Sequence, residues 1–153
     1  MRHQSGFTLV ELIVTMSVLA VLLGIGVPSF QATIQGNRIT TTANDLVAAL
    51  QFARSEAVRR GVNVTLCSSN NQTSCSGTWA DGWVVRGPVA AEAPYRVWPS
   101  LRPGMVLAAG GVAEFNPLGA VITARCYQLN LDTLVRRVNV GPGGRVITAP
   151  QAC

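Results

Sequence analysis

The feature that most constrains this chain is an uncharged stretch of 26 residues, 12–37, close to the N-terminus. Its densest part, residues 12–30, reads LIVTMSVLAVLLGIGVPSF. A helix of about 20 apolar residues, each rising 1.5 Å, covers the roughly 30 Å hydrocarbon core of a bilayer. The sequence therefore predicts a helix that can span a membrane.

A secretory signal peptide is the alternative for such a segment. Its charged region should precede an apolar core of about 7 to 15 residues, with a small-residue cleavage site afterwards. Here a short polar peptide, residues 1–6, comes first, and Glu11 stands at the beginning of the apolar run. A charge at the centre of a membrane helix costs roughly 2.5–3.5 kcal/mol, and less near an end. Glu11 therefore either reaches the membrane interface or pairs with a cation from another molecule.

Composition limits the chemistry of the chain. With 153 residues it can form one domain and an attached segment, and 48% hydrophobic residues against 12% charged ones exclude disorder. All 12 basic residues are arginine, and the single histidine is His3. The chain therefore lacks a lysine for Schiff-base chemistry and, outside its terminus, the usual general base and commonest metal ligand. Its acidic residues are scattered singly, so we expect no enzyme activity, no catalytic residues, no metal and no cofactor.

The chain has four cysteines: Cys67, Cys75, Cys126 and Cys153. No two of them have the C-x-x-C spacing, and no histidine lies near them in the sequence. Disulfides fit this pattern better than a zinc site, and they place residues 67–153 outside the cytoplasm. We predict the pairs Cys67–Cys75 and Cys126–Cys153, because sequence-near pairs each close one local loop. Two other connectivities remain open.

An amphipathic helical pattern follows residue 30. Its apolar stripe recurs at alternating steps of four and three and should lie on a sheet: Ile39, Ala43, Leu46, Leu50, Ala53 and Ala57. Glu56 and Arg60 form a favourable i,i+4 pair, and Gly61 should end the helix. Pro28, preceded by two glycines, should kink or locally melt it.

The remaining residues read as short strands separated by Gly, Pro and Asn, which is typical of an all-β region. The expected strands are residues 62–67, 82–86, 95–98, 105–107, 112–115, 120–122, 126–131, 135–140 and 145–148. Residues 116–119 (NPLG) and 141–144 (GPGG) are turn signals, and the second should join two strands into a hairpin.

Arginine is concentrated in the C-terminal third, where Arg125, Arg136, Arg137 and Arg145 accompany a single acid after residue 114. Such a patch can attract DNA phosphates without sequence preference. A solvated face, or a surface that meets acidic neighbouring subunits, is the alternative. Adjacent strand residues point to opposite faces, so only one of Arg136 and Arg137 should join Arg145.

Residues 6–12, GFTLVEL, resemble the class III signal of type IV pilins and pseudopilins. The resemblance implies that a prepilin peptidase cuts after Gly6 and methylates the new N-terminal amine of Phe7. It also implies that Glu11 pairs with the amine of a neighbouring Phe7 during filament assembly. A buried carboxylate and a buried ammonium satisfy each other only when subunits are in register. In pilins a proline matching Pro28 accompanies a helix that bends or melts on assembly.

Three further segments, LQFARSEAVRRGVNVTLC, TWADGWVV and EFNPLGAV, resemble the GspH/FimT branch of the same superfamily. The implied fold is α+β and pilin-like, with a long N-terminal helix packed on antiparallel β-sheet and with Trp79 and Trp83 near the first hairpin. The implied organisation is a cleaved leader (1–6), the transmembrane part of the helix (7–30), its amphipathic periplasmic half (31–61) and a β-rich periplasmic domain (62–153).

The function implied by the resemblance is that of a minor pilin or pseudopilin that helps to assemble or prime a type IV pilus, at its tip. Its partners would be other pilins or pseudopilins, the prepilin peptidase and an inner-membrane assembly platform. It would start as a single-pass protein of a bacterial inner membrane and end in a pilus or pseudopilus. The alternatives are pseudopilin H of a type II protein secretion system and a minor pilin that binds double-stranded DNA for natural transformation. Family members tied to DNA uptake carry Gly-Arg-x-Arg near the C-terminus; here Gly144 and Arg145 match, and Ile147 replaces the second arginine.

Overall fold

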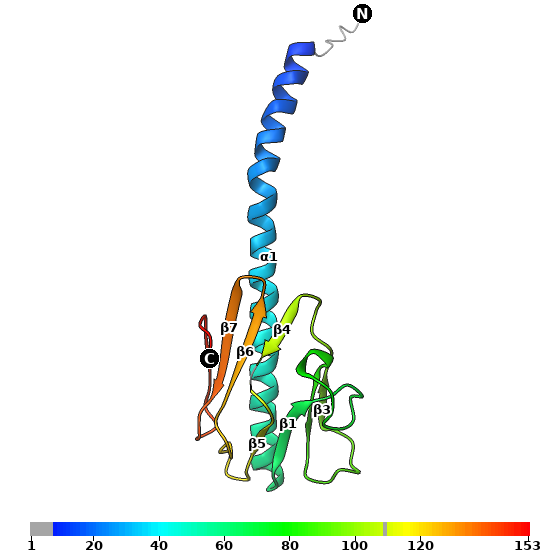
Figure 1. The fold of residues 1–153 in the computed structure, drawn as a ribbon, viewed down its shortest axis with the longest axis vertical. Helices are drawn as coiled ribbons and strands as arrows, with labels where there is room; N and C mark the ends of the chain where they lie inside the picture. Colours follow the sequence, from blue (N-terminus) through cyan, green and yellow to red (C-terminus); the bar gives the residue numbers. More distant parts are fainter. Residues whose placement is uncertain (1–7, 109) are drawn as a thin grey trace, which may run out of the picture. The chain divides into compact units, whose positions relative to one another are not determined.

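The computed structural model describes residues 8–108 and 110–153, apart from the side chains of residues 26–29 (Figure 1). The chain begins with one long helix, α1 (Leu9–Arg60), and continues with short strands. It divides into two compact units, the first ending at Gly36 and the second running from Asn37 to Cys153. The second half of α1 and all the strands therefore belong to the same unit.

The helix α1 is continuous through Pro28, where a kink or local melting was predicted. The backbone from Leu9 to Arg60 is helical throughout, so a melted segment is not present. Proline removes one backbone donor, but its fixed φ is compatible with a helix. A bend or melting that accompanies assembly stays a prediction.

The predicted apolar stripe of the second half of α1 is confirmed, because all six residues are at most 3% exposed. Together with Ala49 they pack against buried side chains from the strands, among them Leu66, Phe115 and Tyr127. The helix ends as expected at Gly61, which has φ +68° and donates its N–H to the carbonyl oxygen of Ala57 at 3.0 Å. Glycine adopts this left-handed conformation without steric cost.

The strands form two four-stranded antiparallel sheets. The first has the order β3–β2–β1–β5 and the second the order β4–β6–β7–β8. The elements that follow α1 are β1 (Val64–Ser68), the short 3-10 helix η1 (Trp79–Asp81), β2 (Trp83–Arg86), β3 (Arg96–Trp98), β4 (Met105–Ala108), β5 (Ala113–Phe115), β6 (Arg125–Leu131), β7 (Leu134–Val140) and β8 (Val146–Ala149). The α+β class and the pilin-like order of a long helix before antiparallel strands are as predicted.

One predicted strand, residues 120–122, is wrong. Only an isolated bridge between Phe115 and Val121 forms there. The side chain of Asn116 explains this, since its Oδ1 accepts hydrogen bonds from the backbone N–H groups of Leu118 and Ala120, both at 3.0 Å. These bonds close the NPLG turn and leave too little extended chain for a strand.

Two hairpins of the second sheet arise from different turn chemistry. The predicted turn at residues 141–144 joins β7 to β8, with the Gly144 N–H donating to the Gly141 carbonyl at 2.8 Å. The turn between β6 and β7 was not predicted, because it contains no glycine or proline. Asp132 takes the left-handed position there, at φ +53°, which aspartate tolerates better than most residues.

Candidate assembly segment and basic surface

The first turn of α1 contains Glu11, and Thr8 caps it. The Thr8 Oγ1 accepts a hydrogen bond from the Glu11 backbone N–H at 3.2 Å, and the Thr8 carbonyl accepts one from the Leu12 N–H at 3.2 Å. A threonine in this position satisfies a donor that has no partner within the helix. Thr8 was not among the predicted site residues, although a threonine three residues before a glutamate is a known capping pattern. Gly6 and Phe7 lie outside the described residues.

The carboxylate of Glu11 forms no ion pair within the part of the chain that the structure describes; the ion pairs there involve Glu56. Glu11 is exposed and lies at the positive end of the helix dipole. Its side chain is thus available to a cation on another molecule. Its pairing with a neighbouring Phe7 remains a prediction.

Between Leu12 and Ile25, α1 exposes apolar side chains around its whole circumference. Its most apolar 18-residue window has a mean hydropathy of 2.4, and none of that window is buried. The hydroxyl groups of Thr15 and Ser17 donate to backbone carbonyls one turn earlier, at 2.9 Å and 2.7 Å, so they are satisfied without water. Such a surface requires lipid or other apolar helices to cover it.

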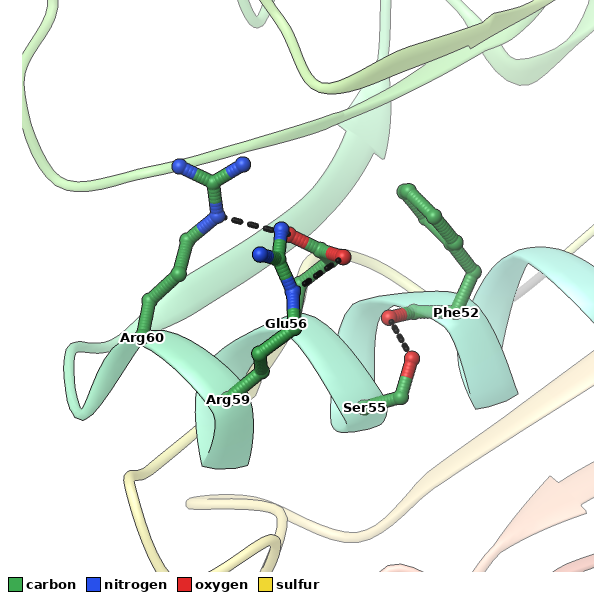
Figure 2. Close-up of polar contacts among 5 residues, drawn as sticks. All are labelled: Phe52, Ser55, Glu56, Arg59 and Arg60. Atoms are coloured by element: carbon green, nitrogen blue, oxygen red, sulfur yellow. Dashed lines mark hydrogen bonds and ion pairs between the residues drawn. The ribbon is translucent and has the colours of Figure 1, made fainter.

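The last turns of α1 hold a cluster of one acid and two bases. Glu56 is only 8% exposed, and Figure 2 shows Arg59 and Arg60 converging on its carboxylate. Arg59 Nη2 and Arg60 Nε each lie 2.6 Å from Oε2 of Glu56, so the predicted Glu56–Arg60 pair is confirmed and Arg59 joins it. Hydrogen bonds from Arg59 and then Arg60 lower the pKa of the Glu56 carboxyl. The carboxylate thus neutralises part of the positive charge of the two arginines.

Aromatic rings hold two arginines of the second unit at positions that the sequence did not indicate. The guanidinium of Arg60 lies 3.9 Å from the ring centroid of Tyr95. That of Arg96 lies 4.8 Å from the Trp98 ring and 5.6 Å from the Phe52 ring. These distances are within cation–π range. The arrangement joins α1 to β3, and the alternation of Arg96 and Trp98 was the signal available in the sequence.

The strand register separates the arginines that were predicted to form a DNA-binding patch. Val138 and Val140 are buried, so Arg136 lies on the same, core-facing side of β7 and Arg137 on the opposite side. Continuing the β8 register by one residue places Arg145 on the side of Arg137. The expectation that only one of the adjacent pair shares a face with Arg145 therefore agrees with the register.

The side chain of Arg125 does not share the face of Arg137 and Arg145. It pairs with Val140 in the register and lies on the core-facing side, where its Nε donates to the carbonyl of Val112 at 2.8 Å. Arg137 and Arg145, on the other face, are separated along the sheet, because Arg137 pairs with Ala149, four residues beyond Arg145. At roughly 3.3 Å per residue this is about 13 Å. The four arginines thus occupy two faces, and a single patch of four is not formed.

Gly144 lies at a close contact between two turns and α1. A Cβ atom at Gly144, which has φ +73°, would meet the carbonyl oxygen of Gly119 and come within 3.1 Å of Arg54 Nε. The Nη1 of Arg54 also donates to the Gly144 carbonyl at 3.3 Å. Gly144, predicted as part of a DNA-binding motif, therefore has a packing role that requires the absence of a side chain.

The four cysteines form the disulfides Cys67–Cys75 and Cys126–Cys153, which is the predicted pairing. The first closes the loop after β1. The second attaches the C-terminal residue to β6, where the Cys153 N–H also donates to Oε1 of Gln128 at 3.0 Å. Within residues 8–108 and 110–153, no group of three His, Cys, Asp or Glu side chains could hold a metal ion.

Solved structures of similar fold are pilus and secretion proteins. A crystal structure of the type IV minor pilin FimU of Pseudomonas aeruginosa has a TM-score of 0.62 and 22% identity, covering 74% of this chain and 90% of that one. The minor pseudopilin EpsH from the type 2 secretion system of Vibrio cholerae has a TM-score of 0.56 and 12% identity, covering 74% and 97%. At these identities the likeness concerns the fold.

Two curated proteins of Pseudomonas aeruginosa, each named "Fimbrial protein", are 27% identical to this chain over 73 residues. The alignment covers 48% of this chain and 47% of each relative. The chain thus spans about half the length of the curated relatives it matches.

Two family descriptions match the sequence itself. The prokaryotic N-terminal methylation motif matches residues 1–27, which contain Gly6, Phe7 and Glu11. The type II transport protein GspH family matches residues 42–144, from the buried half of α1 to the turn before β8. Because this match covers 103 of the 153 residues, the chain belongs to the GspH family.

Proposed function

We propose that this protein is a minor pilin or pseudopilin that enters a filament through its N-terminal helix. The observation that carries the proposal is the start of α1. A capped first turn presents Glu11, which has no ion pair within the described residues, at the head of an apolar helix whose described side chains are exposed up to Ile25. A lone carboxylate on such a helix either reaches the membrane interface or pairs with a cation from another molecule, and only the second holds once the helix is packed among other helices.

In the proposed pathway a prepilin peptidase cuts after Gly6 and methylates the amine of Phe7. The helix then anchors the subunit in a bacterial inner membrane, with the disulfide-bonded second unit in the periplasm. During assembly the apolar helices of several subunits cover one another, and Glu11 pairs with the amine of a neighbouring Phe7. The methylation motif at residues 1–27 and the two disulfides support this course.

We further infer a role in priming assembly, near the tip of the filament. FimU is a type IV minor pilin and EpsH a minor pseudopilin, so both kinds of filament are represented among proteins of this fold. The type IV pilus is our first choice, because the curated relatives are fimbrial proteins. A role as pseudopilin H of a type II secretion system is the alternative.

The test is to express the full precursor with an active prepilin peptidase and to compare two variants with the native chain. Gly6→Ala should leave the precursor uncut. Glu11→Ala should be cut and methylated, as mass spectrometry of the N-terminal peptide would show, but should be lost from sheared filaments. Asp132→Asn, which removes an exposed acid from the β6–β7 turn, is the control and should assemble normally. Normal incorporation of Glu11→Ala would contradict the proposed pairing.

Binding of double-stranded DNA is a second candidate function, favoured by the excess of 11 arginines over 6 acids in residues 37–153. Only Arg137 and Arg145 of the four C-terminal arginines share a face away from the core. Each phosphate contact contributes about 0.9 to the log–log salt slope, so these two predict a slope near −2. The full chain in detergent should bind DNA weakly, and Arg145→Gln should reduce the slope by about one unit.

The control for this assay is Arg38→Gln, an exposed arginine near the start of the second unit. Arg54 is unsuitable because it bonds Gly144. A salt slope that does not change when Arg137 and Arg145 are both replaced, or no DNA binding at low salt, would contradict this second function. The filament role would then be the one proposed function that remains.

A further inference from the structure

Two arginines of the second unit lie on aromatic rings where the end of α1 meets β3 and the residue before it. The guanidinium of Arg60 covers the ring of Tyr95 at 3.9 Å from its centroid. The guanidinium of Arg96 lies over Trp98 of β3 at 4.8 Å and over Phe52 of α1 at 5.6 Å. We call these five residues the arginine–aromatic seam.

The two arginines of the seam differ in their acidic partners. Arg60 donates from Nε to Oε2 of Glu56 at 2.6 Å. This hydrogen bond, with smaller contributions from the charges of Glu56 and Glu92, raises the pKa of Arg60. Arg96 is exposed, and it forms no hydrogen bond or ion pair with any other residue that the structure describes. The charge of Arg60 is therefore compensated within the chain, and that of Arg96 is not.

Stacking prepares Arg96 for a planar acceptor. Aromatic rings contact the flat faces of a guanidinium, while its five N–H donors lie in its own plane. A carboxylate can accept two of these hydrogen bonds in parallel. The rings of Phe52 and Trp98, which pack edge to face at 6.2 Å, limit the conformations of the Arg96 side chain. Less side-chain entropy is then lost when an acceptor binds.

The place of Arg96 in the fold leaves it open to another chain. β3 is an edge strand of the first sheet, whose order is β3–β2–β1–β5. Arg96 and the following Val97 are both exposed on this edge. A second molecule can therefore reach the seam without displacing any strand of this one.

We propose that the seam binds an aspartate or glutamate side chain of a neighbouring filament subunit, with Arg96 as the residue that contacts it. The proposal rests on the filament role proposed above. Charge complementarity favours this occupant, because the two arginines of the seam exceed the one acid bonded to them, Glu56, by one positive charge. A nucleic-acid strand fits less well. The guanidinium groups already lie on the rings where bases would stack, and Glu56 and Glu92 repel successive phosphates.

The direct test follows the indole N–H signal of Trp98 by NMR, in the full chain in detergent micelles with ¹⁵N-labelled tryptophan. The probes are acetyl-glutamate methylamide and its glutamine counterpart, which have the same shape and differ in charge. The glutamate probe should move the signal saturably and bind at least about fivefold more tightly than the glutamine probe. Dimethyl phosphate, the charged unit of a nucleic-acid backbone, should bind more weakly than the glutamate probe, because a carboxylate is the stronger acceptor.

Two arginine variants separate the stacked fork from its charge. Arg96→Lys keeps the positive charge but loses the planar donor pair, so the glutamate probe should bind at least about fivefold more weakly. Arg38→Lys makes the same change at an exposed position of α1 outside the seam, and it should leave the binding unchanged. The signal of Trp83, which is buried in the core, checks that both variants are folded.

Incorporation into sheared filaments distinguishes the seam from the filament role itself. Arg96→Gln should be cut and methylated like the native chain, but its recovery from filaments should fall at least about threefold, while Arg38→Gln should be recovered normally. Absence of the native chain from filaments would contradict the filament role, whatever the probes do. The seam proposal is overturned if the glutamate probe does not move the Trp98 signal or binds Arg96→Lys as tightly as the native chain. It is also overturned if dimethyl phosphate binds as tightly as the glutamate probe, or if Arg96→Gln enters filaments as well as the native chain does.

Discussion

Gly144→Ala should lower the free energy of unfolding of the second unit by about 3 kcal/mol, because Gly144 is buried in the turn between β7 and β8. Two effects add. Alanine in the left-handed conformation, at φ +73°, costs about 1–2 kcal/mol. The new Cβ would also collide with the Gly119 carbonyl oxygen, and backbone atoms cannot move aside as a flexible side chain can. The turn must shift, and the hydrogen bond from Arg54 to Gly144, worth about 1 kcal/mol, is lost.

The neighbouring glycine is a matched control. A Cβ on Gly143 would meet nothing within 4 Å, and its φ lies outside the left-handed region. Gly143→Ala should therefore be neutral, or stabilise by up to about 1 kcal/mol through the unfolded chain. Denaturant unfolding of the full chain in detergent, followed by tryptophan fluorescence, measures both variants. A loss below about 0.5 kcal/mol for Gly144→Ala would refute the packing role.

Three further outcomes follow from buried or cross-linked groups. Arg59 and Arg60 lower the pKa of Glu56 in the folded state. The ionised carboxylate therefore stabilises the fold fully at a pH above the ordinary glutamate pKa of about 4.3. This stabilisation is lost as the pH falls through the lower pKa that Glu56 has in the folded state. Denaturant unfolding between about pH 5 and pH 3 should thus show a smaller pH dependence for Glu56→Gln than for the native chain. Replacing Cys126 and Cys153 by serine should lower the free energy of unfolding by about 3.5 kcal/mol, and the same change at Cys67 and Cys75 by about 2.5 kcal/mol. The difference follows from the loops that the disulfides close, with sequence separations of 27 and 8 residues. Thermal unfolding should therefore show the larger loss of stability for the Cys126 and Cys153 variant. Arg86→Met should cost about 2–3 kcal/mol and accelerate amide hydrogen exchange around residues 89–90, because Arg86, 7% exposed, donates to the carbonyls of Val89 and Ala90.

Periodicity predicted the elements of this fold well where one physical rule acted alone. The stripe from Ile39 to Ala57 follows the helical repeat, and all of it is buried. The hairpin at residues 141–144 follows from glycine conformation and formed as expected. The expected strand at 120–122 failed because a local rule competed, namely the side chain of Asn116 bonding its own turn. Such competition becomes visible only when backbone partners are known.

The candidate site was harder to predict, because a sequence shows which residues are charged but not which way their side chains point. Arg86 is one of the 12 arginines of the sequence, and nothing in the sequence indicated that it would be buried against backbone carbonyls. Trp83 lies in the core, and nothing in the sequence indicated that its N–H would have no acceptor among the residues that the structure describes. The cap at the start of α1 was not predicted either, although Thr8 lies only three residues before Glu11 and this spacing is a known capping pattern.

The distribution of arginine bears on which proposed function the second unit serves. The C-terminal arginines favoured DNA binding only if they converged, and the alternation of side chains along β7 prevents this by sending Arg136 and Arg137 to opposite faces. A net positive charge spread over two faces still attracts polyanions at long range, but it does not position several phosphates at once. The same spread suits a subunit that meets acidic neighbours on more than one side. The position of the charges therefore favours the filament role over DNA capture.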